Sequence, residues 1–123
     1  MSSRILIVDA NAEMRRTIRK VVEESTDLRV CGEGADGQDA IEKASQLKPD
    51  LIVLDLSPKL NGFQVARTPK RSMPKVRLVL FSLEDSKFVQ KAAKAAGISA
   101  VASKMEGAAS LFRGLRVALQ SAA

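Results

Sequence analysis

The sequence predicts an α/β fold in which a parallel sheet of five strands is covered by helices on both faces. Five short apolar segments alternate strictly with segments whose apolar residues recur at helical spacing, and the connections between them are short. Such alternation is typical of parallel sheets, because each crossover helix returns the chain to the same end of the sheet. For five strands the common order of this doubly wound class is 2-1-3-4-5, and residues 1–123 suit one domain of that size.

The first half of the chain contains three of the predicted strands. In order, we predict a strand at residues 4–9, a helix from about 11 to 25, a strand at 28–33, a helix over 40–47 and a strand at 51–55. The first and third strands are runs of isoleucine, leucine and valine, which is typical of strands buried on both faces. Apolar residues recur three and four positions apart in both helical segments, as expected of helices with one buried face.

The second half continues the alternation with two further strands. We predict a helix beginning near residue 63, a strand at 76–81, a helix that ends at Gly97, a strand at 98–102 and a final amphipathic helix over 108–119. Glycine commonly follows the last turn of a helix, because it adopts the left-handed conformation without steric cost.

Thr68-Pro69 falls about two turns into the third predicted helix. A proline in a helix interior lacks the amide hydrogen of the helical ladder and costs about 3 kcal/mol, or it ends the helix. We therefore expect the third helix to be short, irregular or displaced near Pro69.

Composition excludes several classes of protein. No segment is long and apolar enough to span a bilayer, and the first residues lead directly into a strand, so we expect neither a membrane anchor nor a signal peptide. Histidine is absent, which excludes acid–base catalysis by histidine and the ligation of a metal ion by histidine. The single cysteine, Cys31, cannot form an internal disulfide, and its strand-like flanks predict a buried thiol. We therefore expect a cytoplasmic protein.

The net charge of +6 is unevenly distributed along the chain. Residues 1–62 carry nine Lys/Arg against eleven Asp/Glu, and residues 63–123 carry eleven against three. The basic residues are dispersed along amphipathic helices, and the chain has no Trp, no Tyr and only four Phe to stack on bases. This pattern favours an acidic protein partner, or a solvated basic face, over nucleic acid.

Polar residues follow four of the predicted strands: Asp9, Asp55, Ser82 and Lys104. Asp9 and Ser82 could simply cap the helices that follow them. Asp55 could be a polar strand terminus, and Lys104 an ordinary solvated lysine. However, ligand sites in open parallel sheets lie at the carboxyl ends of the strands, so all four fall on the functional edge.

Two carboxylates, a hydroxyl and an ammonium suit phosphoryl chemistry better than acyl transfer. No base stands beside a nucleophile, and the turn after the first strand lacks both G-x-G-x-x-G and a Walker sequence. Carboxylates do accept phosphoryl groups as aspartyl phosphates. A second carboxylate would hold Mg²⁺, and the lysine and hydroxyl would bind the phosphoryl oxygens.

With these residues in place, the chain resembles bacterial response-regulator receiver domains of the stand-alone, chemotaxis-regulator type over essentially its whole length. The resemblance implies the flavodoxin-like receiver fold and signalling by phosphorelay rather than enzymatic activity. It rests on segments 5–9, 49–55, 61–62, 79–82, 95–100 and 103–104, in this order and spacing.

The resemblance also implies a role for each of the four strand-end residues. Asp55 would be phosphorylated by a histidine kinase or a phosphotransfer protein. Ser82 would be the Ser/Thr switch residue, and Lys104 the lysine that contacts the phosphoryl group. Asp9 would be the first member of an acidic pair that helps to bind Mg²⁺. Downstream, an unidentified protein partner would bind the face made by the fourth helix, fifth strand and fifth helix.

The sequence departs from the family pattern at the expected metal site. The family has two successive acids after the first strand, and here Ala10 replaces the second, which is the direct metal ligand. The loop between Asp55 and Pro58 is one residue shorter than usual, which affects the Ser57 carbonyl, the remaining backbone ligand. The ligands left are Asp9, Asp55 and the Ser57 carbonyl. We therefore expect Mg²⁺ binding to be weak or absent.

Three functions remain open at this point. The first is a receiver that accepts a phosphoryl group and signals through protein contacts, which Asp55, Ser82 and Lys104 favour. The second is a degenerate receiver that serves as a phosphorylation-independent interaction module, which Ala10 and the short loop favour. The third is a small-molecule or nucleotide binder on a flavodoxin-like sheet, and the missing phosphate loop counts against it.

Overall fold

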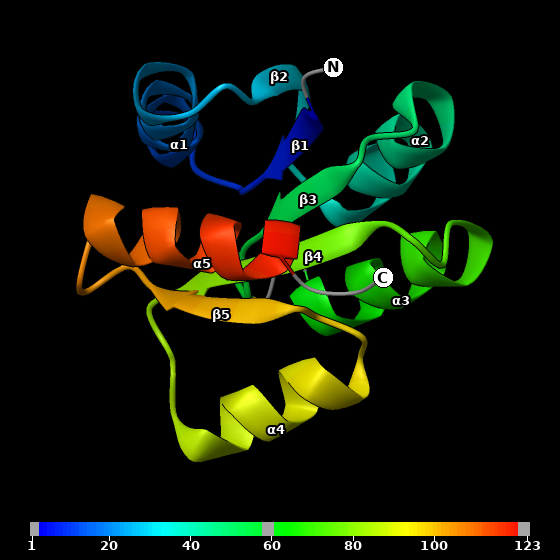
Figure 1. The fold of residues 1–123 in the computed structure, drawn as a ribbon. Coiled ribbons are helices and arrows are strands. Elements are labelled where there is room, and N and C mark those ends of the chain that lie inside the picture. The colour runs from blue at the N-terminus through cyan, green and yellow to red at the C-terminus, as the bar shows by residue number, and fades with distance from the viewer. Residues whose placement is uncertain (1–2, 58–60, 121–123) are drawn as a thin grey trace.

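The computed structural model describes residues 3–57 and 61–120, in which strands and helices alternate along the chain (Figure 1). Every predicted element is present, with bounds that shift by a few residues at most. The strands are β1 (Arg4–Val8), β2 (Arg29–Gly34), β3 (Leu51–Leu54), β4 (Arg77–Ser82) and β5 (Ala100–Ser103). The helices are α1 (Ala12–Ser25), α2 (Gly37–Leu47), α3 (Gly62–Ser72), α4 (Lys87–Ala95) and α5 (Ala108–Gln120).

The five strands form one parallel sheet in the order β2-β1-β3-β4-β5, which confirms the predicted topology. β1 lies between β2 and β3, so that Val8 is paired with Gly34 on one side and with Leu54 on the other. The strand order reverses direction between β1 and β3. In sheets of this kind, that position at the carboxyl ends is where ligands bind.

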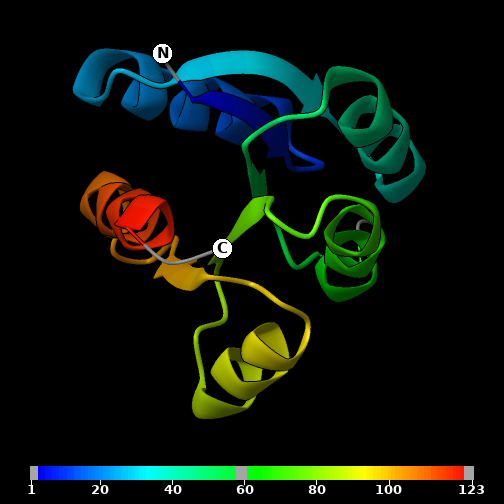
Figure 2. The ribbon, with the colours of Figure 1, turned by 45° about the vertical axis from the view of Figure 1, so that its right-hand side comes forward.

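Helices cover both faces of the sheet (Figure 2). Alternate residues of each central strand face opposite sides, and in β1 Leu6 and Val8 pack on one face while Ile5 and Ile7 pack on the other. The first face is covered by α2, α3 and α4, and the second by α1 and α5. Two apolar layers therefore enclose the sheet, which explains why its central strands read as unbroken apolar runs.

The third helix continues past its proline. α3 runs without interruption to Ser72, so the expectation that it stops or becomes irregular near Pro69 is wrong. Pro69 lies in the last turns and is buried, so the helix loses one amide donor while the ring gains packing. The Met73 amide donates to the Pro69 carbonyl at 2.7 Å, and the Lys70 ammonium donates to the Val76 carbonyl at 2.8 Å. These contacts hold the last turn against the local cost of proline.

Two smaller expectations have different outcomes. Gly97 follows the end of α4 with a φ of +85°, which confirms the predicted cap. Cys31 lies in the edge strand β2 and is partly exposed rather than buried as predicted, although burial still raises the pKa of its thiol. Within the described part of the chain, no helix is both long and apolar enough to cross a membrane.

Candidate functional site

The four predicted polar residues lie together at the carboxyl edge of the sheet. The Asp55 amide donates to the Val8 carbonyl at 3.0 Å, which extends the pairing of β3 with β1 by one residue. The Lys104 amide donates to the Ser82 carbonyl at 2.8 Å, which does the same for β5 and β4. Asp9 follows Val8 directly and is buried. The parallel register thus turns four separate positions in the sequence into one site.

At the centre of this edge, the Lys104 ammonium bridges two carboxylates. Its Nζ lies 2.8 Å from Asp9 Oδ2 and 2.9 Å from Asp55 Oδ1. The three side chains are only 10%, 2% and 11% exposed, for Lys104, Asp9 and Asp55 in that order. We call these three residues the Lys104 triad. Charge-assisted hydrogen bonds in such a sheltered place are short and strong, so the triad holds its carboxylates in fixed positions.

The two carboxylates keep Lys104 protonated. Burial alone would lower its pKa, but the hydrogen bonds and charges of Asp9 and Asp55 outweigh burial and raise the pKa above the ordinary lysine value of 10.5. When folding raises the pKa of a group, the protonated group stabilises the folded state, and this contribution is fully present below the unfolded pKa. The contribution is lost as the pH rises through the folded pKa. The triad is therefore intact at neutral pH.

A second ionic cluster fixes the loop that carries Asp9. The Asn11 amide donates to Asp9 Oδ1 at 2.9 Å, and Arg15 Nη1 donates to the Asp9 carbonyl at 2.7 Å. Arg15 also pairs with Glu33 at 3.0 Å, and Arg19 pairs with the same carboxylate at 2.7 Å. Burial raises the pKa of Glu33, but the guanidinium of Arg19 and then that of Arg15 outweigh burial, and the pKa is lowered. Sequence reasoning missed this cluster, because its members are far apart in the chain.

Ser82 lies at the end of β4, on the same edge as the triad. Its side chain is buried, and its hydroxyl oxygen accepts a hydrogen bond from the Glu84 amide at 3.1 Å. The alternative that Ser82 caps the following helix is wrong, because α4 is capped by Ser86, whose hydroxyl oxygen accepts from the Val89 amide at 3.3 Å. Ser82 instead supports the turn before α4. Accepting this bond leaves the hydroxyl hydrogen of Ser82 able to donate to another group.

Gly62 packs directly against the backbone of Asp55. A Cβ atom at Gly62 would overlap the Asp55 carbonyl oxygen and would lie 3.2 Å from its carbonyl carbon. Only glycine allows the start of α3 to approach the end of β3 so closely. The Asn61-Gly62 pair was already one of the segments that resemble the family. Its position in the sequence did not, however, indicate that the glycine contacts the Asp55 backbone.

The oxygen donors at this edge do not match a complete Mg²⁺ site. Ala10 supplies no ligand, and both oxygens of the Asp9 carboxylate already accept hydrogen bonds from the protein. The Ser57 carbonyl accepts a bond from the Asn61 amide at 2.9 Å. Among residues 3–57 and 61–120, no group of three or more acidic or cysteine side chains is placed to hold a metal ion. Pro58, the other expected departure, lies outside the described residues.

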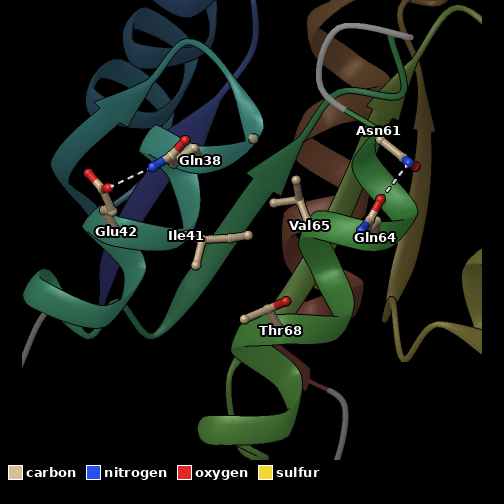
Figure 3. A pocket seen from close by; sticks show the side chains of 8 residues that line it. Gln38, Ile41, Glu42, Asn61, Gln64, Val65 and Thr68 are labelled. Carbon is tan, nitrogen blue, oxygen red and sulfur yellow. Dashed lines mark hydrogen bonds between the residues drawn. The ribbon is translucent and has the colours of Figure 1, made fainter.

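A separate groove of about 490 Å³ lies between α2 and α3 (Figure 3). Ile41 and Val65 face it from opposite helices, and a polar rim surrounds them. The rim includes a hydrogen bond of 2.8 Å from Asn61 to Gln64. No member of the Lys104 triad is among the described lining residues, so the groove is distinct from the polar edge of the sheet.

Comparison with known proteins identifies this arrangement. The sequence model of the response regulator receiver domain matches residues 5–116. The chain belongs to this family. It is therefore a receiver domain of two-component signalling, and the predicted resemblance is confirmed. Receiver domains typically bind Mg²⁺ and interact with histidine kinases and phosphotransfer proteins.

Similar proteins include parts of larger regulators. The chain is 33% identical over 116 residues to protein-glutamate methylesterase/protein-glutamine glutaminase 1 of Myxococcus xanthus, covering 94% of this chain and 34% of that protein. It is 36% identical over 89 residues to the response regulator protein VraR of Staphylococcus saprophyticus, covering 70% and 43%. The chain thus spans less than half the length of these relatives. Among solved structures, the response regulator domain of Thermotoga maritima CheB has a TM-score of 0.88 and 27% identity, with full coverage of both chains.

Proposed function

We propose that this receiver accepts a phosphoryl group on Asp55 from the phosphohistidine of a histidine kinase or a phosphotransfer protein. The observation that supports this most strongly is the pairing of Asp55 with Lys104 at 2.9 Å in a largely buried site. In the transfer, a carboxylate oxygen of Asp55 forms a bond to phosphorus. The bond from phosphorus to the imidazole nitrogen breaks, and its electron pair stays with the nitrogen.

The neighbouring residues supply charge and hydrogen bonds for this step. Lys104 bonds one oxygen of Asp55, and its ammonium can neutralise charge on the incoming phosphoryl oxygens. Asp9 shares the same ammonium and holds it in position. Ser82, with a hydroxyl hydrogen that is able to donate, would bind a phosphoryl oxygen once Asp55 is modified.

We further propose that Mg²⁺ binds this site weakly or not at all at millimolar concentrations. Mg²⁺ requires near-octahedral oxygen ligation and usually relies on one or two carboxylates with water. Here the family's direct acidic ligand is replaced by Ala10, and Lys104 already bonds both remaining carboxylates. The positive charge that the protein itself brings to the phosphoryl group is therefore that of Lys104, and we expect phosphorylation to be slow.

Labelling by a small phosphodonor tests the proposal. We expect slow addition of one phosphoryl group per chain in acetyl phosphate, detected by intact-mass spectrometry and located on Asp55 by borohydride trapping. Asp55→Asn is expected to abolish the added mass, because an amide is not a nucleophile at phosphorus. Equal labelling of the asparagine variant would show that the phosphoryl group is elsewhere and would refute the assignment of Asp55.

A second candidate is a phosphorylation-independent interaction module, which the alanine at position 10 favours. This function keeps the fold and its surfaces but does not use Asp55 as a nucleophile. It predicts that partner binding is identical for the unmodified protein and Asp55→Asn, with or without phosphodonor. A binding change that requires both phosphodonor and Asp55 would exclude it.

The surface proposed for a downstream partner is basic. It lies on α4, β5 and α5, and its exposed charges include Lys87, Lys91, Lys94 and Arg113. An acidic partner would be steered to this face, so the association rate is expected to fall steeply with ionic strength. Reversing Lys87 and Lys91 to glutamate is expected to slow association about tenfold or more at low salt. A partner footprint, mapped by cross-linking, that falls wholly on α1 and α2 would refute this surface.

We also propose that residues 1–123 form one receiver module that acts in the cytoplasm, through protein contacts rather than as an enzyme. The family match over residues 5–116 supports a single module. The lone cysteine suits a reducing compartment, where disulfides are rare.

A further inference from the structure

The charge of the polar edge differs from what the family pattern implies. With a second acid at position 10, two acids after β1, Asp55 and Lys104 would leave two excess negative charges, which one divalent cation neutralises. With Ala10, the Lys104 triad has only one excess negative charge. A divalent cation would more than neutralise this single charge and would leave a net positive charge in a site that is about nine-tenths buried.

Both carboxylates also already accept hydrogen bonds from the protein. Asp9 accepts from Lys104 through Oδ2 and from the Asn11 amide through Oδ1. Asp55 accepts from Lys104 through Oδ1. A metal ion at this edge would compete with the Lys104 ammonium, which makes two short bonds to these carboxylates. The backbone amide of Lys104 is in turn bonded to the Ser82 carbonyl, which fixes the position of the residue.

We propose that Lys104 is the resident cation of this receiver and takes the place of the divalent ion, so that the folded site is assembled without metal. The inference rests on the proposed equivalence of this edge with the receiver's metal site. It does not depend on whether Asp55 is phosphorylated. It follows that the site recruits Mg²⁺ only when its excess negative charge is raised from one to two.

Two opposite substitutions make that change. Lys104→Met removes the ammonium and leaves Asp9 and Asp55 close together without a counter-ion. Ala10→Asp keeps the ammonium and adds a carboxylate beside Asp9. Although the first removes a side chain and the second adds one, both are expected to create a response to Mg²⁺ that the unmodified chain lacks.

Thermal unfolding in the absence of any phosphodonor tests the proposal and is therefore independent of phosphorylation. Midpoints are measured with and without millimolar MgCl₂, at ionic strength matched with NaCl. We expect no shift above the salt control for the unmodified chain. Lys104→Met is expected to unfold about 10 °C lower and to recover by about 5 °C or more in Mg²⁺. Ala10→Asp is expected to gain a similar Mg²⁺-dependent rise.

Control variants separate the role of Lys104 from general effects. Lys20→Met removes an exposed lysine of α1 and is expected to leave both the midpoint and the Mg²⁺ response unchanged. Lys104→Arg keeps the charge and is expected to remain insensitive to Mg²⁺. If Lys104→Met does not fold alone, refolding in Mg²⁺ is the readout: recovery supports the proposal and no recovery overturns it. A Mg²⁺-dependent rise in the unmodified chain, or its absence in Lys104→Met, also overturns it.

Discussion

The chain with aspartate in place of Ala10 and a methionine inserted after Ser57 is expected to bind Mg²⁺ and to label at Asp55 at least about a hundredfold faster than the unmodified protein. Aspartate at position 10 returns the direct acidic ligand and gives the site two excess negative charges. The insertion restores the family's loop length and so releases the Ser57 carbonyl from its present bond to Asn61. Mg²⁺ would then neutralise charge as the phosphodonor approaches.

The experiment combines a Mg²⁺ titration with the rate of mass addition from acetyl phosphate. Ala10→Asp alone is expected to recover only part of the effect, because the ligands act as one coordination sphere. The insertion alone is expected not to recover Mg²⁺ binding, because it leaves the excess negative charge of the site at one. The inert variant Asp55→Asn, built into the repaired chain, controls for phosphoryl addition elsewhere. If the unmodified chain binds Mg²⁺ and labels as fast as the repaired one, the departures at position 10 and in the loop do not affect metal binding or phosphorylation.

The fold could be predicted because its determinants are local in the sequence. The runs at 5–8 and 51–54 are apolar at every position, and such runs form strands only where both faces are covered. The strand order followed from strict alternation and short connections. Asp9, Asp55 and Lys104 could be placed together for the same reason, since the carboxyl ends of parallel strands share one edge.

What the sequence did not reveal depends on contacts between distant segments. The continuation of α3 through Pro69 relies on the bond from Lys70 to Val76 in the following connection, which propensity does not include. The Arg15–Glu33 pair joins α1 to β2 across eighteen positions. Likewise, the sequence placed Lys104 near Asp55 but did not indicate that its ammonium also bonds Asp9. Such details are set by the packing of the folded chain.

Gly62→Ala is the substitution for which local propensity and packing predict opposite signs. Gly62 is the first residue of α3, and alanine is the better helix former by up to about 1 kcal/mol, so propensity alone predicts a more stable protein. The new Cβ would, however, overlap the carbonyl oxygen of Asp55, and a backbone atom cannot move aside cheaply. We expect packing to prevail and the free energy of unfolding to fall by about 3 kcal/mol.

Chemical denaturation measures this change, and labelling of Asp55 reports its effect on the site. Displacement of the Asp55 backbone is expected to weaken the bond to Lys104, so labelling is expected to fall even where the variant remains fully folded. Gly107→Ala is the matched control: its φ is +74° and no atom lies within 4 Å of the added Cβ. It is expected to lose only about 1–2 kcal/mol from left-handed strain and to label normally. An alanine at position 62 that stabilises the protein would mean that α3 can move away from β3, and that the close approach of Gly62 does not position the phosphoacceptor.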